Sequence, residues 1–259
     1  MKVTFYGQNS LAIEVAGKHI IVDPFITGSD LAKDKVDIKD LKADYIFLTH
    51  AHQDHILDAE AIAKNTGAKI VSNAEIASHY ESKGFEAHPM NHGGSWNFDF
   101  GKVKYVVAHH SSSFPDGSYG GQPGGFVFET EEGNLYIAGD TALTLDMKLI
   151  PMRTKLDLAV LPIGDNFTMD VDDAIIASDF IECDKILGCH YDTFGFIKID
   201  HNLAKDKFKM KNKELYLFGF ILDSQCCSPK WKQLTKTKNN SAKEGKKKNN
   251  KPPISTVSK

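Results

Sequence analysis

Short apolar runs separated by polar turns dominate the start of the chain and predict β-strands. The first three runs cover residues 3–6, 11–15 and 19–22. Gly17 lies between the second and the third, as a hairpin turn requires. The chain therefore begins with a group of short strands that follow one another closely.

From residue 45 onward, the pattern changes to strands that alternate with helices. The apolar run 45–48 precedes a helical pattern at 57–64, which Gly67 would end. A further strand at 69–71 precedes a helical pattern at 74–83. This alternation is typical of β-α units.

The second half of the chain repeats this order. Its predicted elements are strands at 103–108, 126–129, 134–138, 158–161 and 185–189, and a helix at 171–181. Two half-chains of this kind suggest two sheets packed face to face with helices outside. Periodicity by itself establishes only a mixed α and β protein of two or three layers.

Candidate ligands for metal ions follow the 45–48 strand directly, in the segment His50-Ala51-His52-Gln53-Asp54-His55. In an extended strand end, residues two apart point the same way, so His50 and His52 can approach one metal ion. Asp54 and His55 are out of phase with that pair and would face a second ion. Imidazole and carboxylate suit zinc, iron or manganese. The alternative is a chance polar cluster at a turn, which the strand-to-helix context disfavours.

This HxHxDH pattern resembles the signature of the metallo-β-lactamase superfamily. Members of that superfamily supply three more ligands in a fixed order: a His, a bridging Asp and a final His. The candidates are His110, Asp140 and His190, and each follows an apolar run. Polar residues at the ends of strands are where α/β architectures place their sites. The resemblance implies an α+β fold, a four-layer αββα sandwich of two mixed β-sheets flanked by helices.

Other segments extend the resemblance to about residues 1–220. They look like the uncharacterised bacterial metal-dependent hydrolases near ascorbate-6-phosphate lactonase, and they are residues 5–10, 21–25, 110–112, 139–142 and 190–194. They characterise the family and do not specify a substrate.

The resemblance also implies a metal centre and a reaction. It assigns the ligands as follows: His50, His52 and His110 on one ion, Asp54, His55 and His190 on the other, and Asp140 bridging both. Two divalent metal ions are expected, Zn²⁺ first, with Mn²⁺ or Fe²⁺ as alternatives. A metal-bridging hydroxide would hydrolyse a small ester, lactone or phosphate-bearing metabolite. Asp54 is the catalytic candidate, since it could orient the hydroxide or shuttle a proton.

Two alternatives remain open within this ligand set. His109 lies beside His110, and alternation at a strand end allows only one of them to face the metals. The family match favours His110. Ser111, Ser112 and Ser113 could be read as nucleophiles, but polar loop residues that hold the ligand turn are the simpler interpretation.

Composition is ordinary for a soluble globular protein, with 41% hydrophobic and 25% charged residues among 259. We expect one catalytic domain at residues 1–221 and a basic, disordered tail at residues 222–259. Residues 228–259 carry +9 by count, so −12 remains for residues 1–227. The body's negative charge repels a polyanion, although the tail could attract one.

Location and partners follow from features that the sequence lacks. It has no apolar run long enough to span a membrane and no signal-peptide pattern at its start. Its four cysteines suggest neither a zinc ribbon nor a disulfide framework. We expect a cytoplasmic protein with a small-molecule substrate and no membrane partner. Nucleic acid is disfavoured, and a homo-oligomer is left open.

Two other function classes use the same fold. One is an iron-dependent redox protein, but such relatives typically carry a carboxylate where this first motif has histidine. The other is a phosphodiesterase or nuclease, but the nuclease branch adds a large inserted domain. A binding module without activity is a third class, disfavoured because every ligand position is filled. Arg153 is the chain's one arginine, so strongly anionic substrates lack an obvious clamp, and lactones are expected first.

Overall fold

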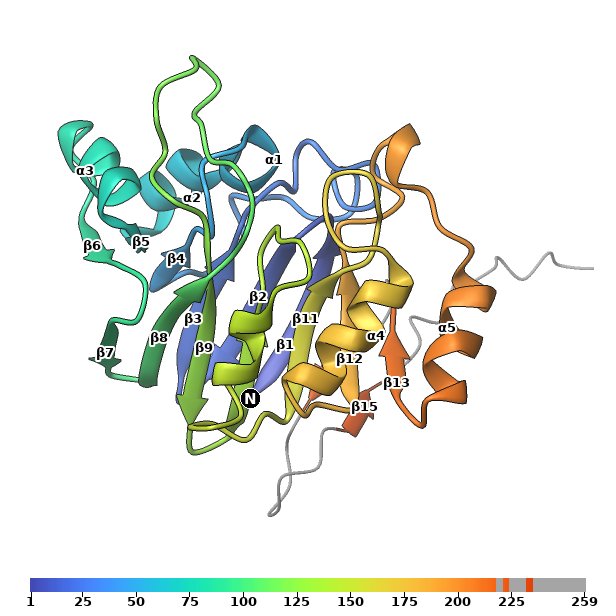
Figure 1. The fold of residues 1–259 in the computed structure, drawn as a ribbon. Helices are drawn as coiled ribbons and strands as arrows, with labels where there is room; N and C mark the ends of the chain where they lie inside the picture. The colour runs from blue at the N-terminus through green and yellow to red at the C-terminus, as the bar shows by residue number, and fades with distance from the viewer. Residues whose placement is uncertain (218–220, 224–231, 235–259) are drawn as a thin grey trace, which may run out of the picture.

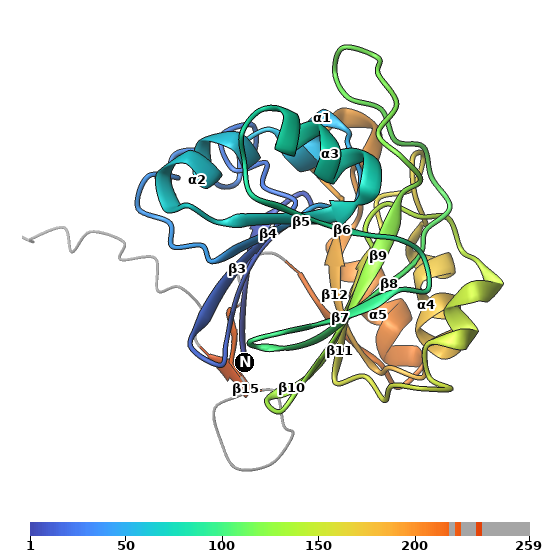
Figure 2. The same ribbon diagram turned by 90° about the vertical axis from the view of Figure 1, so that its left-hand side faces the viewer.

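The structure is a computed structural model that describes residues 1–217, 221–223 and 232–234. Two β-sheets pack against each other and helices cover their outer faces (Figures 1 and 2). The predicted four-layer αββα sandwich is therefore confirmed. The predicted tail at residues 222–259 lies mostly outside the described residues, so its disorder stays a prediction.

The first sheet has eight strands in the order β15-β14-β1-β2-β3-β4-β5-β6. Strands β1 to β3 are antiparallel, whereas β3 to β6 are parallel. The bounds are β1 Lys2–Gly7, β2 Ser10–Val15, β3 Lys18–Val22, β4 Tyr45–Phe47, β5 Lys69–Asn73, β6 Ala87–Met90, β14 Ile221–Asp223 and β15 Lys232–Leu234.

The second sheet has seven strands in the order β13-β12-β11-β10-β9-β8-β7. Strands β10 to β13 are parallel, and β7 to β10 are antiparallel. Strand β8 therefore runs in the same direction as β10, β11 and β12. The bounds are β7 Ser95–Phe98, β8 Gly101–Val107, β9 Gly124–Thr130, β10 Gly133–Ile137, β11 Leu158–Pro162, β12 Lys185–Cys189 and β13 Glu214–Tyr216.

Helices α1, α2 and α3 cover the first sheet, and α4 and α5 cover the second (Figure 2). Their bounds are α1 Gln53–Ile56, α2 Ala59–Thr66, α3 Ala74–Ser82, α4 Val171–Phe180 and α5 His201–Met210, with 3₁₀ turns η1 Leu145–Leu149 and η2 Gly195–Ile197. Gly67 ends α2 in the left-handed conformation at φ 74°, as predicted. Among the described helices, none combines the length and the apolar character needed to cross a bilayer.

Alternation along β4 shows how the two faces of the first sheet are used. Phe47 belongs to the core between the sheets, whereas Ile46 and Leu48 belong to a second core under the helices. Phe47 packs edge-on against Phe126 of the second sheet, with ring centroids 5.1 Å apart. Because both faces of β4 are buried, the run is continuously apolar, as is usual for parallel strands.

The sequence analysis did not predict strands β6 and β7 or helix α5. The two strands are short, and the helix carries many charged residues. The predicted strands at the start of the chain and in the β-α units are confirmed within a few residues. The consequence for function is that the carboxyl ends of β4, β8, β10 and β12 meet at one edge of the sandwich.

Candidate metal centre

The loops that leave four strand ends bring all seven predicted ligands together at this edge. His50, His52, Asp54 and His55 follow β4, and the other three follow β8, β10 and β12. They form two groups that could each hold a metal ion: His50, His52 and His110 in one, and Asp54, His55, Asp140 and His190 in the other. Within each group, the candidate ligand atoms lie within 4.8 Å of one another.

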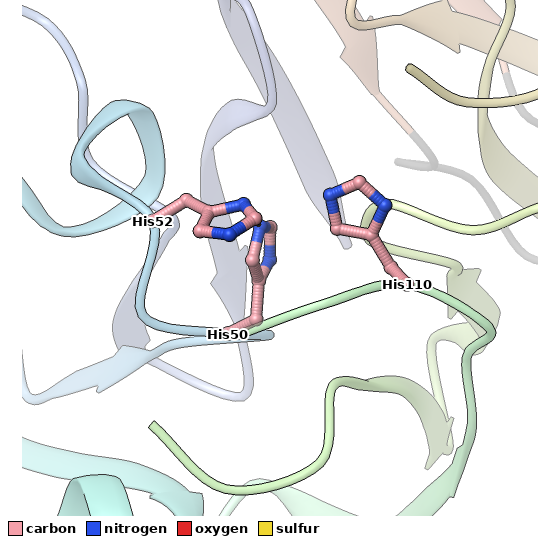
Figure 3. A group of neighbouring side chains, drawn as sticks. All are labelled: His50, His52 and His110. Carbon is pink, nitrogen blue, oxygen red and sulfur yellow. The ribbon is translucent and has the colours of Figure 1, made fainter. Parts of the chain in front are cut away.

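The first group consists of three imidazoles that face one another (Figure 3). The Nε2 atom of His50 lies 2.9 Å from Nδ1 of His52. The His110 ring centroid lies 5.2 Å from that of His50 and 5.1 Å from that of His52. His50 is fully buried and His110 is 15% exposed, so His50 lies on the interior side of this group and His110 lies toward solvent.

The second group contains two carboxylates and two imidazoles. Nε2 of His55 lies 3.4 Å from Oδ2 of Asp54, and Nε2 of His190 lies 3.6 Å from the same oxygen. His55, Asp140 and His190 are buried, whereas Asp54 is 22% exposed. Asp54 is therefore the member of this group that faces the opening.

Asp140 joins the two groups through one oxygen. Its Oδ2 lies 3.8 Å from Nε2 of His50 and 3.5 Å from Nε2 of His110. The same oxygen lies 3.3 Å from Nε2 of His55 and 3.0 Å from Nε2 of His190. This is the place that a carboxylate must occupy to bridge two ions.

A buried network under the site orients His50 and His55. Asp23 accepts hydrogen bonds from Nδ1 of His55 at 2.8 Å and from the Thr49 hydroxyl at 2.6 Å. Since Thr49 donates its proton to Asp23, its oxygen can accept from Nδ1 of His50, 3.0 Å away. With Nδ1 of both rings directed at these acceptors, a bound metal ion would meet Nε2 of each ring once that nitrogen has lost its proton, the arrangement usual for metal ligands. Asn9 completes the network by donating to Asp23 at 2.6 Å.

Gln8 supports the opposite side of the site. Its side-chain Nε2 donates to Oδ2 of Asp54 at 2.7 Å, and its backbone carbonyl accepts from the backbone N–H of His190 at 2.6 Å. Gln8, Asp23 and His190 all adopt positive φ, at 52°, 43° and 54°. Strained backbone of this kind gathers at functional sites, where the surrounding structure maintains it.

Gly139 and Gly164 lie beside the ligands at positions where neighbouring atoms leave no space for a Cβ. A Cβ at Gly139, where φ is 66°, would lie 2.7 Å from the Thr49 side chain. A Cβ at Gly164 would lie 2.0 Å from the His190 carbonyl oxygen. Any larger residue at either position would displace a ligand loop.

Burial and charge act differently on the two groups. Burial lowers the pKa of His50, His52 and His110, and neighbouring imidazoles lower it further. Burial also acts to lower the pKa of His190, but Asp140 and Asp54 outweigh it and raise that pKa to about 9. The pKa of His55 is raised in the same way. The first group is thus neutral, whereas in the second group protons offset the carboxylates.

The residues present fit metal ions. In the described part of the chain, Nε2 of His55 and Oδ1 of Asp140 are buried without a hydrogen-bond partner. Buried polar atoms without partners are costly, and a bound cation would satisfy them. Nitrogen and carboxylate oxygen are donors that zinc, iron and manganese accept.

The structure places His110 in the first ligand group and His109 outside both groups. His109 is 57% exposed and its Nε2 lies 3.3 Å from Asp146, away from both groups. Ser112 accepts from the Ala51 N–H and donates to the Gly120 carbonyl, so it holds the ligand loop. Ser111 lies 3.4 Å from Nε2 of His52.

Sequence reasoning missed Asp23, Gln8 and Asn9 as parts of the site. The Asp23 segment contributed to the family resemblance without a role for the residue. The signal that could have found it is a carboxylate at the end of an apolar run, the criterion that located Asp140.

Comparisons with known proteins agree with this geometry. The family model of the beta-lactamase superfamily domain matches residues 2–190. A UPF0173 metal-dependent hydrolase of Christiangramia forsetii is 79% identical over 84% of this chain and 96% of its own length. One from Flavobacterium johnsoniae is 74% identical over 85% of this chain and 97% of its own. The solved structure of Igni18, a metallo hydrolase of Ignicoccus hospitalis, superposes with a TM-score of 0.76. It is 33% identical and covers 84% of this chain and 94% of its own.

Two mixed sheets between helices, with a His and Asp cluster at one edge, define the metallo-β-lactamase fold. The chain belongs to this superfamily, and within it to the UPF0173 family, whose members are named metal-dependent hydrolases. The predicted superfamily is confirmed. The narrower resemblance to the ascorbate-6-phosphate lactonase branch stays a prediction.

Proposed function

We propose that the protein hydrolyses a small ester or lactone with two divalent metal ions, Zn²⁺ first. Metal-dependent hydrolysis follows from the family, and the number of ions and the substrate are our inference. The observation that carries it is the position of Asp140, whose Oδ2 faces Nε2 of His50, His110, His55 and His190. A carboxylate oxygen directed at both groups supports a site for two ions.

The donor set leaves room for substrate. The first group offers His50, His52 and His110, and the second offers Asp54, His55 and His190, with Asp140 shared. When bound, two such ions would lower the pKa of a shared water to ~7 and polarise the scissile group.

Asp54 has the second role in this proposal. It is the partly exposed carboxylate of the site, and Gln8 holds its Oδ2. A carboxylate at the opening can accept a proton from the attacking water and deliver it to the leaving group. Asp23 is a positioning residue, because it acts through His55 and Thr49 and lies below the ligands.

Charge favours a neutral or singly charged substrate. Arg153 lines a hollow of about 390 Å³ with Val106 and Met152 beside η1, and none of the seven ligands lines that hollow. A phosphate clamp by arginine is therefore absent from the described part of the site. The −12 charge of residues 1–227 further disfavours polyanions. We place lactones first, other esters next and phosphodiesters last.

Metal content is the first test. Purified protein should hold two transition-metal ions per chain, and Asp140→Ala and His55→Ala should each lower that number. Asp146→Ala is the matched control, because Asp146 is an exposed carboxylate near the site whose Oδ2 contacts His109 and Thr144 and which belongs to neither ligand group. A wild-type protein that holds no transition metal would overturn the proposal.

Substrate class is the second test. Lactones, aryl esters and bis-aryl phosphodiesters should be compared with zinc and with manganese. Lactone turnover should exceed phosphodiester turnover. The reverse order would correct the substrate class and leave the two-metal centre standing.

A further inference from the structure

Exposed apolar side chains gather on two loops that carry ligands of the second group and on the neighbouring loop between β11 and α4. We define the apolar rim as Leu57, Phe167, Phe194 and Phe196, which are 39%, 51%, 39% and 78% exposed. Leu57 follows His55 by two residues, and Phe194 follows His190 by four. Single exposed apolar residues are common, but a group of them beside a site marks an interaction surface.

Apolar contacts connect the rim residues across four loops, partly through Phe25. Phe194 packs against Phe25, with ring centroids 6.2 Å apart, and Phe167 packs against Phe196 at 6.3 Å. Phe25 and Leu57 both lie against Gly28, where a Cβ would approach their side chains within 3 Å. The rim therefore continues from the loop after Asp23, across the loop after His55, to the loop after His190.

Backbone contacts fix these loops relative to the ligands. The Met169 N–H donates to the Thr141 carbonyl at 3.2 Å, which ties the loop of Phe167 to Asp140. Gly164 at the start of the same loop lies against the His190 carbonyl. The Asp192 N–H donates to the Ile197 carbonyl at 2.8 Å, and this closes the turn that presents Phe194 and Phe196. The rim is thus built on the same backbone as the second group of ligands.

Charge near the rim does not favour an anionic group. Asp165 is exposed two residues before Phe167. Lys198, two residues after Phe196, shares a hollow of about 200 Å³ with Asp165, Asp170 and Asp200. Asp172 and Lys207 line the same hollow, so carboxylates outnumber ammonium groups around it.

We propose that the apolar rim binds an uncharged apolar acyl group of the substrate and sets the enzyme's preference for longer chains. This inference rests on the proposed function, and it deepens that function by naming the substrate's apolar part. Each substrate methylene that reaches the rim should raise kcat/KM by a factor of about four until the rim is covered. The metals would hold the scissile carbonyl while the chain lies along Phe194 and Phe196.

The first test of the proposed role of the rim is the dependence of ester turnover on acyl chain length. The substrates are 4-nitrophenyl esters from acetate to octanoate, measured with zinc-loaded protein. In the wild type, kcat/KM should rise with chain length. In Phe194→Ala and Phe196→Ala, the ratio of octanoate to acetate kcat/KM should fall about tenfold, and Phe196→Leu should restore most of it. Trp96→Ala is the matched control, since Trp96 is 55% exposed on β7, and it should leave the ratio unchanged.

A binding assay distinguishes an error in the assignment of the rim from an error in the proposed hydrolase activity. Linear alkyl hydroxamates bind metal ions without being hydrolysed, and their affinity should rise with chain length in the wild type and less in Phe196→Ala. That result without any ester turnover would support the rim and overturn the proposed reaction. Turnover and binding that are independent of chain length would overturn the rim. A rim variant that changes the oligomeric state in light scattering, with unchanged chain-length dependence, would show that a second copy covers this surface instead.

Discussion

The carboxylate of Asp23 lies 2.8 Å from Nδ1 of His55, and both residues are fully buried. This contact directs Nε2 of His55 toward Asp140. Thirty-two residues separate the two in the chain, so the arrangement depends on β3 and β4 lying side by side. The orientation of a ligand is therefore set by the sheet rather than by the ligand's own loop.

Replacing Asp23 should weaken metal binding without replacing a ligand. We expect Asp23→Asn to lower the affinity for the more weakly bound ion by about 10–100-fold, the usual cost of losing such a partner. Competition titration with a zinc chelator measures this affinity. Asp58→Asn is the control, because Asp58 is also buried but accepts hydrogen bonds from Ile26 and Thr27. An equal loss in both variants would mean that the effect is a general one on folding.

His109 and His110 should respond differently to substitution. His110→Ala removes an imidazole that faces Asp140 and should lower kcat/KM by at least 100-fold together with metal content. His109→Ala removes an exposed side chain and should change kcat/KM by less than about threefold. Steady-state kinetics and metal analysis of the two variants show which of the two histidines is the metal ligand. A larger loss in His109→Ala would reverse the assignment.

Metal affinity should fall as the pH is lowered. In the metal-free protein, Asp140 and Asp54 outweigh burial and raise the pKa of His190 to about 9. The charged imidazole stabilises the metal-free fold fully below about pH 6.5, and this contribution is lost as the pH rises through about 9. A metal ion needs the neutral imidazole, so each displaced proton should cost about tenfold in affinity per pH unit below 9. Calorimetry in buffers of different ionisation enthalpy counts these protons. An affinity that is flat from pH 7 to 9 would contradict the prediction.

Removing the metals should destabilise the fold. The site holds the buried carboxylate of Asp140 next to that of Asp54, and without ions their charge is offset only by protons. Free zinc at 100 times the Kd of one site should stabilise the protein by about 2.7 kcal/mol through that site. For a domain of this size, that corresponds to a rise in Tm of roughly 5–10 °C over the chelated protein. Thermal unfolding with and without chelator measures the shift, and His50→Ala should show a much smaller one. An equal shift in both proteins would mean that the zinc binds elsewhere.

The ligands could be predicted because the HxHxDH motif resembles the superfamily's signature and because each remaining candidate follows an apolar run. His50, Asp140 and His190 all leave buried strands, and an apolar run that ends in a polar residue is a local signal. Gly67 was predictable for the same reason, since a helix end needs only its own neighbours. Periodicity could not show which face of each strand meets the other sheet. Ile46 and Phe47 are both fully buried, on opposite sides of β4.

Asp23 and Gln8 could not be assigned because their roles depend on distant partners. Gln8 contacts Asp54, 46 residues away, through a backbone conformation that is uncommon for a residue with a side chain. Helix α5 was missed although its signals were present. Asp200 caps its start, and Ala204 and Phe208 are the buried positions four residues apart. The many lysines around them hid that pattern.

The ligands of each group come from both sheets. His50 and His52 leave the first sheet and His110 leaves the second, while His55 leaves the first and His190 the second. Each ion would therefore act as a cross-link between two halves of the chain, in addition to their apolar packing and to hydrogen bonds such as that from the Ala51 N–H to Ser112. After the two halves separate, neither would keep the complete ligand set of either ion. Loss of metal and parting of the sheets should then be a single cooperative event, and a chelator should accelerate global unfolding rather than only the fraying of the loops.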